Sequence, residues 1–164
     1  FMDRFLLFRT FDELQVGDRQ RTRGRTITET DIVSWCALTG DWFYPHIDAV
    51  AAEQSMFGQR VAPGIMVFAM ATGLGVPADA TTILANYGTD ALRYLKPTWI
   101  GDTVYLEIEL LEKVERNPGS GLATYRWDVL NQRGETVCTS RLKILTAKVR
   151  APYPGAPSAP GPEE

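Results

Sequence analysis

The residues best suited to acid–base chemistry in this sequence are a carboxylate and an imidazole five positions apart. Asp41 precedes His46, the only histidine among 164 residues, in the segment Thr-Gly-Asp-Trp-Phe-Tyr-Pro-His. Imidazole is the side chain that ordinarily titrates near neutral pH, and a nearby carboxylate is a ready base. Gly40 and Pro45 favour a turn that brings the two groups toward one point. The pattern predicts one catalytic centre that moves protons.

Both residues also have ordinary structural explanations. Aspartate after glycine often stabilises a turn or caps a helix, and His46 suits a half-buried position within the turn. From the residues alone, these explanations for Asp41 and His46 are as good as catalysis. Asp48, two residues further on, is better explained as the N-cap of the following helix.

Two helices are expected to flank this segment and hold it in place. Thr28, with Asp31 three residues later, is typical of a capped helix start, and the helix should run to about residue 38. Gly40 then ends it. A second, short helix is expected over residues 49–55. The predicted catalytic segment therefore lies between two helix ends.

A longer helix is predicted from Pro63 to Gly75 and, after Pro77, a sheet. The helix residues are apolar on every side, which indicates a helix buried all round. Strands are expected at 82–87, 89–96, 102–116, 121–131 and 135–148. Turn signals rich in glycine and asparagine separate them, so the sheet should be antiparallel. Together these elements predict an α+β fold in which a curved antiparallel sheet wraps one long central helix.

The composition favours one globular domain and excludes several classes of partner. With 45% hydrophobic and 23% charged residues it is ordinary for a soluble protein, and a net charge of −3 gives no reason to expect nucleic acid. No apolar run approaches the ~20 residues that span a bilayer. The proline-rich residues 149–164 are expected to form a flexible tail after a domain at 1–148. Four arginines, expected on the exposed face of a strand, are Arg19, Arg21, Arg23 and Arg25.

The cysteines and the histidine give no metal-binding pattern. Cys36 and Cys138 lie far apart in dissimilar segments, and one histidine supplies no cluster, so no metal is expected. Two buried, reduced thiols are the expected state of these cysteines. That state favours a cytoplasmic protein.

Three motifs resemble the MaoC-like acyl dehydratases, which include the (R)-specific enoyl-CoA hydratases. They are Thr-Gly-Asp followed by His-x-Asp, then Phe-Gly-x-Arg-Val-Ala-Pro-Gly-Ile-Met, and finally Arg-Tyr-Leu-Lys-Pro with Gly-Asp-Thr. The resemblance covers about residues 10–148 and implies the hotdog fold. It agrees with the enclosed helix and antiparallel sheet expected from the residues. It also implies a lyase of fatty acid metabolism that needs no cofactor.

The resemblance implies roles for three groups. Asp41 and His46 match the family's catalytic pair, which acts through a water molecule, with Asp41 as general base and His46 as general acid in hydration. The backbone N–H of Gly64 matches the donor that binds the thioester carbonyl. A helix N-terminus suits this role because its first N–H groups are unpaired and carry partial positive charge.

Three further residues are expected to line the substrate site. Thr72 matches a small hydroxyl residue eight positions after Gly64. Phe43 and Tyr44 stand where the family commonly has asparagine and proline. Phe43 cannot hydrogen-bond the catalytic groups as an amide would, so the site is expected to be drier or differently shaped. This departure bears on the identity of the substrate more than on the class of reaction.

The implied substrate is an acyl-CoA or acyl-carrier-protein thioester. Its arm is anionic, and the candidates to meet it are Arg60, Arg93 and Lys96. An unpaired sheet edge and half a substrate tunnel favour a homodimer. The alternatives are a polyketide-tailoring dehydratase and a non-catalytic hotdog subunit that binds acyl groups. A thioesterase is less favoured because hotdog thioesterases generally lack the spacing between Asp41 and His46.

Overall fold

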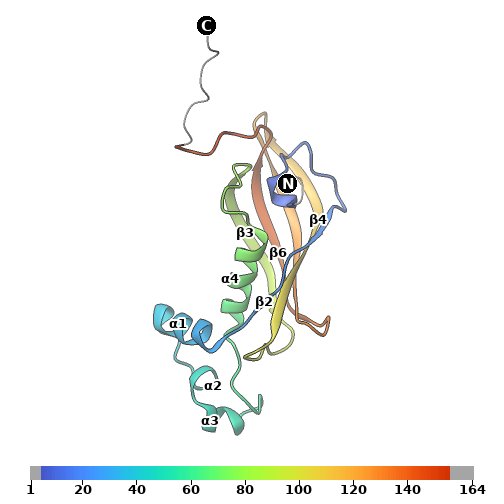
Figure 1. Cartoon of the computed structure of the whole chain (residues 1–164). Coiled ribbons are helices and arrows are strands. Elements are labelled where there is room, and N and C mark those ends of the chain that lie inside the picture. Colours follow the sequence, from blue (N-terminus) through green and yellow to red (C-terminus); the bar gives the residue numbers. More distant parts are fainter. Residues whose placement is uncertain (1–4, 156–164) are drawn as a thin grey trace.

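A six-stranded antiparallel sheet runs alongside one long helix, α4, in the computed structural model, which describes residues 5–155 (Figure 1). The helices are η2 (Leu6–Phe8), α1 (Glu29–Thr39), α2 (Tyr44–Ile47), α3 (Ala49–Glu53) and α4 (Gly64–Gly75). The strands are β1 (Arg19–Arg21), β2 (Arg25–Thr26), β3 (Ile83–Tyr94), β4 (Thr103–Asn117), β5 (Ser120–Leu130) and β6 (Thr136–Ala147). Helices α1, α2 and α3 gather beyond one end of α4, away from the sheet (Figure 1).

The strands follow the order β1-β4-β5-β6-β3, with β2 also paired to β4. Strand β3 therefore forms one edge of the sheet. The predicted break at Tyr87-Gly88 is wrong, because β3 is one continuous strand whose register against β6 shifts between Asn86 and Gly88. Glycine here marks a bulge in a strand instead of a turn between two strands. The other turn signals do separate strands as expected.

Helix α4 buries one side against the sheet. Met66, Val67 and Ala71 are buried, and an added Cβ at Gly75 would lie 2.5 Å from Leu106 and 2.7 Å from Trp127. This close packing explains glycine at the end of the helix. The prediction that this helix is buried on all sides is wrong for a single chain, because the sheet covers only one side of it. The outward stripe remains exposed at Ile65, Ala69 and Gly73.

Helix α1 has both ends expected from the sequence. The Thr28 hydroxyl accepts from the Asp31 N–H, and the Asp31 carboxylate accepts from the Thr28 N–H. Gly40 ends the helix in the left-handed conformation, with φ of 76°. Asp48 caps α3 by accepting from the Ala51 N–H. These caps confirm the predicted helices on both sides of the Asp41–His46 segment.

Three of the four arginines expected on the exposed face of a strand lie in strands, Arg19 and Arg21 in β1 and Arg25 in β2, whereas Arg23 lies between the two strands. Arg19 and Arg21 lie on exposed strand β1 and pair with Glu109 and Glu107 of β4. Residues 149–155 contain no helix or strand, whereas the rest of the predicted tail, 156–164, lies outside the described residues. Within residues 5–155, no helix is long and apolar enough to cross a membrane.

Candidate active site

His46 is held in one orientation by the segment that precedes α4. It is the third residue of α2, is only 9% exposed, and its Nδ1 lies 2.7 Å from the carbonyl oxygen of Val61. A carbonyl oxygen can only accept, so Nδ1 carries the proton in this contact. The second nitrogen, Nε2, is then the atom available for exchanging a proton with a substrate or a water.

Asp41 lies between the end of α1 and the start of α2. Its N–H donates to the Thr39 hydroxyl at 3.2 Å, and its side chain is half-buried. Among residues 5–155, its carboxylate accepts no hydrogen bond and forms no ion pair within 4.0 Å. Burial raises the pKa of the neighbouring Cys36 thiol, and the Asp41 charge raises it further. Asp41 is therefore a carboxylate free to accept from water.

A cavity of about 330 Å³ opens beside His46 and the start of α4. Its lining includes His46, Gly64 and Val67, together with Tyr94 from β3 and Cys138 from β6. Most of these groups are apolar, which suits an acyl chain better than a charged ligand. The cavity is therefore a place where an acyl group can lie between the imidazole and the helix N-terminus.

Gly64 is the first residue of α4 and leaves no room for a side chain. An added Cβ would lie 2.7 Å from the ring of Tyr94. Pro63 precedes it as N-cap and supplies no side-chain hydrogen bond. Within the described chain no hydrogen bond uses the Gly64 N–H. The start of α4 thus presents an unpaired donor at the cavity.

Two other titratable side chains of the cavity, Cys138 and Tyr94, are neutral near pH 7. Burial raises the pKa of Cys138 to about 11, and the Asp128 charge adds to this. Burial also raises the pKa of Tyr94. A thiol in this state is a poor nucleophile, because the thiolate is the reactive form. Because the Lys96 ammonium is paired with Glu135, His46 is the side chain of the cavity best suited to exchange protons with a substrate.

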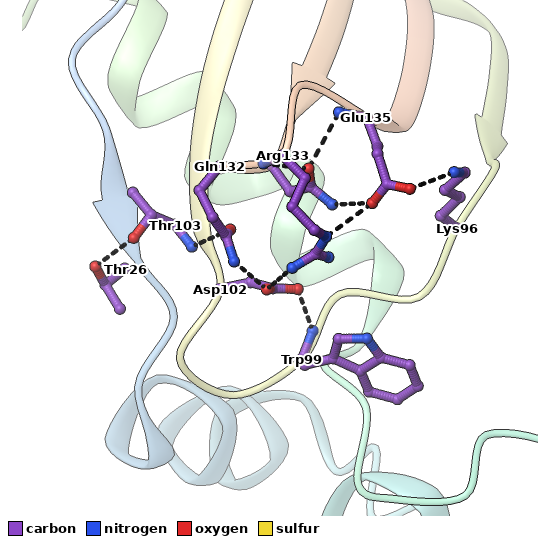
Figure 2. Close-up of polar contacts among 9 residues, drawn as sticks. Thr26, Lys96, Trp99, Asp102, Thr103, Gln132, Arg133 and Glu135 are labelled. Carbon is purple, nitrogen blue, oxygen red and sulfur yellow. Dashed lines mark hydrogen bonds and ion pairs between the residues drawn. The ribbon is translucent and has the colours of Figure 1, made fainter.

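A polar network, shown in Figure 2, fixes the turn that follows residues 94–98, which line the cavity. Asp102, 4% exposed, accepts from the Trp99 N–H, Gln132 and Arg133 at 2.7–3.0 Å. Burial alone would raise the pKa of Asp102, but these three hydrogen bonds more than offset it and hold the pKa below its usual range. The Ala62 N–H in turn donates to Thr98, next to Trp99. The network thereby supports the segment just before α4.

The same network reaches Lys96 at the cavity. Lys96 donates to Glu135 at 2.6 Å, and Arg133 donates to Glu135 at 2.9 Å (Figure 2). Hydrogen bonds from Lys96, Asn131 and Arg133 lower the pKa of Glu135 to about 2. The turn between β5 and β6 was expected only as a turn. Its role in holding the cavity wall was not predicted, because side-chain pairing between distant segments leaves no local pattern.

The structure brings some of the predicted site residues to the cavity and leaves others elsewhere. His46 and Gly64 line it, whereas Asp41 lies in the adjoining segment. The Thr72 hydroxyl donates to Phe68 within α4 at 3.2 Å. Phe43 is exposed and packs edge-on against the His46 ring, with 5.7 Å between ring centroids. Phe43 therefore contacts the imidazole through its ring while remaining exposed to solvent.

Tyr44 and the candidate cations differ in their accessibility. Tyr44 is exposed and packs against the Phe43 ring at 5.1 Å. Arg93 is exposed and donates to the neighbouring Leu92 carbonyl. Lys96 lines the cavity. Among the residues described, no group of three or more histidine, cysteine or acidic side chains is placed to hold a metal ion.

Comparison with known proteins identifies relatives over most of the chain. The family model of the MaoC like domain matches residues 13–129. Protein MaoC of Klebsiella aerogenes is 41% identical over 119 residues, which are 72% of this chain and 36% of that protein. Mesaconyl-CoA hydratase of Cereibacter sphaeroides is 34% identical over 161 residues, 93% of this chain and 45% of that protein. The chain spans less than half the length of these two relatives.

Solved structures agree with this relationship and with the fold. A monoamine oxidase regulatory protein from Archaeoglobus fulgius is 35% identical, with a TM-score of 0.81 over 86% of this chain and 95% of that one. A double-hotdog protein from Mycobacterium tuberculosis is 20% identical, with a TM-score of 0.73 over 90% of this chain and 46% of that one. The second likeness concerns the fold alone. The predicted α+β hotdog fold is confirmed.

Proposed function

The chain belongs to the family of MaoC-like dehydratases, and on that premise we propose that it reversibly hydrates 2-enoyl thioesters to (R)-3-hydroxyacyl thioesters. One observation carries the proposal. His46 and the unpaired N–H of Gly64 line the same largely apolar cavity. An acyl thioester in this cavity meets a proton donor and an electrostatic stabiliser together.

Hydration makes three demands, and three groups of this chain suit them. The Asp41 carboxylate accepts a proton from water as the oxygen attacks C3. His46, protonated on both nitrogens, donates from Nε2 toward C2 while Nδ1 stays bound to Val61. The Gly64 N–H stabilises the enolate charge that develops on the thioester oxygen. Dehydration reverses the two proton transfers.

The proposed substrate carries its acyl group on coenzyme A or on a carrier protein. The cavity is apolar inside, and the Lys96 ammonium stands at its lining. A cation there suits the anionic arm of either carrier. The hydratase from Cereibacter sphaeroides, whose substrate is a CoA thioester by its name, supports this class of substrate.

We propose that the working form is a homodimer. Within residues 5–155, strand β3 has a partner strand on only one side, and its residues Leu84 and Tyr87 are exposed. The outward stripe of α4 around Ile65 is exposed as well. Pairing of a second copy along β3 would complete the sheet and cover apolar surface.

A second candidate function is a non-catalytic subunit that binds acyl groups. It is favoured by the regulatory role in the name of the structure from Archaeoglobus fulgius. The two functions differ in turnover. The purified protein is mixed with crotonyl-CoA and the loss of enoyl-thioester absorbance is followed. Turnover to the (R)-3-hydroxy product supports the hydratase, whereas tight binding of acyl thioesters without turnover supports the binding subunit.

A further inference from the structure

Two adjacent residues, Arg60 and Val61, hold His46 through two hydrogen bonds and the preceding Pro45 through a third. The imidazole donates from Nδ1 to the Val61 carbonyl at 2.7 Å. The Arg60 Nε donates to the main-chain carbonyl of His46 at 2.8 Å. The Val61 N–H donates to the carbonyl of Pro45 at 3.0 Å. The side chain and the backbone of His46 are therefore fixed by the same short segment.

Helix α2 needs this support because it cannot hold itself. It has four residues, and its N-cap Phe43 offers no side-chain hydrogen bond. A single helical turn is unstable alone, because ordering its residues costs more free energy than its one hydrogen bond provides. Its last carbonyls also lack partners within the helix. The Arg60 guanidinium satisfies one of them, at His46 itself.

The same guanidinium ties His46 to helix α1. Arg60 Nη1 donates to the Glu29 carboxylate at 2.9 Å, and the Arg60 side chain is only 17% exposed. A planar guanidinium directs separate N–H groups to two acceptors, which a lysine ammonium cannot do with the same geometry.

We propose that Arg60 is a positioning residue that fixes the backbone of His46 and thereby keeps its Nε2 aimed at the cavity. The expected effect on turnover rests on the proposed hydratase function, whereas the effect on the imidazole does not. Arg60 itself does not line the cavity. This position outside the cavity argues against the role of meeting the anionic arm of the substrate. Lys96, which lines the cavity, suits that role.

Kinetics of the full-length chain separate these two roles of Arg60. Arg60→Gln should lower kcat about 10- to 100-fold, because a displaced acid–base group loses its alignment. KM should change less than about twofold for both crotonyl-CoA and crotonyl-pantetheine. Arg60→Lys should also have low activity, because an ammonium group lacks the separately directed N–H groups of the planar guanidinium. Arg19→Gln, which removes an exposed Arg–Glu pair on β1, is the matched control and should keep the wild-type kcat. A KM increase confined to crotonyl-CoA would overturn the proposal in favour of contact with the arm.

The single histidine gives a readout that needs no activity. In tag-free protein labelled with nitrogen-15, one imidazole reports the state of His46. In wild-type protein, the neutral imidazole should be the Nδ1–H tautomer. In Arg60→Gln, it should be a mixture of the two tautomers. Arg60→Lys takes the place of Arg60→Gln if that variant fails to fold. An unchanged imidazole spectrum in a folded variant would contradict the proposal. Wild-type protein that lacks turnover but shows this Arg60 dependence would refute the proposed function and leave the positioning role standing.

Discussion

At the scale of single residues, the start of α4 combines a packing requirement with a chemical one. Gly64 offers an unpaired N–H at the cavity, and the Tyr94 ring occupies the space of a side chain there. Both requirements concern the same place, because a side chain at position 64 that displaced the Tyr94 ring would also change how a substrate reaches the Gly64 N–H. Gly64 is thus explained by packing, whatever its part in chemistry.

Gly64→Ala should therefore destabilise the protein and lower turnover. The new Cβ would lie 2.7 Å from the Tyr94 ring, and overpacking of this kind typically costs about 1–3 kcal/mol. Thermal unfolding and kcat/KM with crotonyl-CoA measure the two effects. Gly73→Ala is the matched control on the same helix, because no atom lies within 4 Å of its added Cβ. Equal melting temperatures for the two variants would contradict the packing explanation.

The sequence was informative about residues whose role depends on local spacing. The five-residue interval between Asp41 and His46 and the Ala-Pro-Gly start of α4 pointed to His46 and Gly64, which line one cavity, and to Asp41 in the adjoining segment. The hydrogen bond from Arg60 to the His46 carbonyl was not predicted, because it joins residues 14 positions apart through a side chain. From the sequence, Arg60 was instead a candidate for the anionic arm, because a basic residue close to the predicted site suits that role.

At the scale of elements, the capping box of α1 anchors one side of the catalytic segment. Thr28→Ala removes the hydroxyl that accepts from the Asp31 N–H and should cost about 1 kcal/mol of unfolding free energy. Denaturant unfolding measures this loss. Thr30→Ala, an exposed threonine in the first turn of the same helix, should change stability by less than about 0.5 kcal/mol. A Thr28→Ala loss no larger than the Thr30→Ala loss would refute the capping role.

The turn before β4 gives stability a specific dependence on pH. The folded-state pKa of Asp102 is lowered, so its stabilisation is present above its unfolded pKa of about 3.9 and is lost as pH falls further. Asp102→Asn should cost about 2 kcal/mol near pH 7, and the difference from wild type should shrink below about pH 4. Urea unfolding across pH tests this.

Asp79→Asn, at an exposed loop position, is the control for that series and should leave stability unchanged. A difference between Asp102→Asn and wild type that stays constant from pH 7 to pH 3 would contradict the lowered pKa. The network around Asp102 would then act through shape alone.

The sequence predicted best those elements whose ends carry residue types that start or stop a helix. Helices α1 and α4 have a cap, a proline or a glycine at each boundary, and they lie within about a residue of expectation. Helix α2 was expected only as a turn, because its single turn depends on the hydrogen bonds from residues 60–61. The break expected at Gly88 was wrong, because pairing with β6 carries the strand through its bulge.

At the scale of the whole molecule, one chain leaves apolar surface uncovered. The expectation that α4 is buried all round failed for a single chain, because the sheet has one layer. A second copy that covers Ile65 and pairs along β3 would restore the expected burial. We expect light scattering after gel filtration to give twice the mass of the chain at micromolar concentration. A monomer at that concentration would contradict the proposed dimer.

The roles of Asp41 and His46 are tested most directly by comparing three proteins with crotonyl-CoA: wild type, Asp41→Asn and His46→Gln. We expect rapid loss of enoyl-thioester absorbance with wild type and formation of the (R)-3-hydroxy product. Both variants should remain folded and lose at least about 100-fold in kcat, as expected for removal of an acid–base group. Wild-type turnover that survives in a folded His46→Gln or Asp41→Asn protein would contradict the assignment of chemistry to this pair.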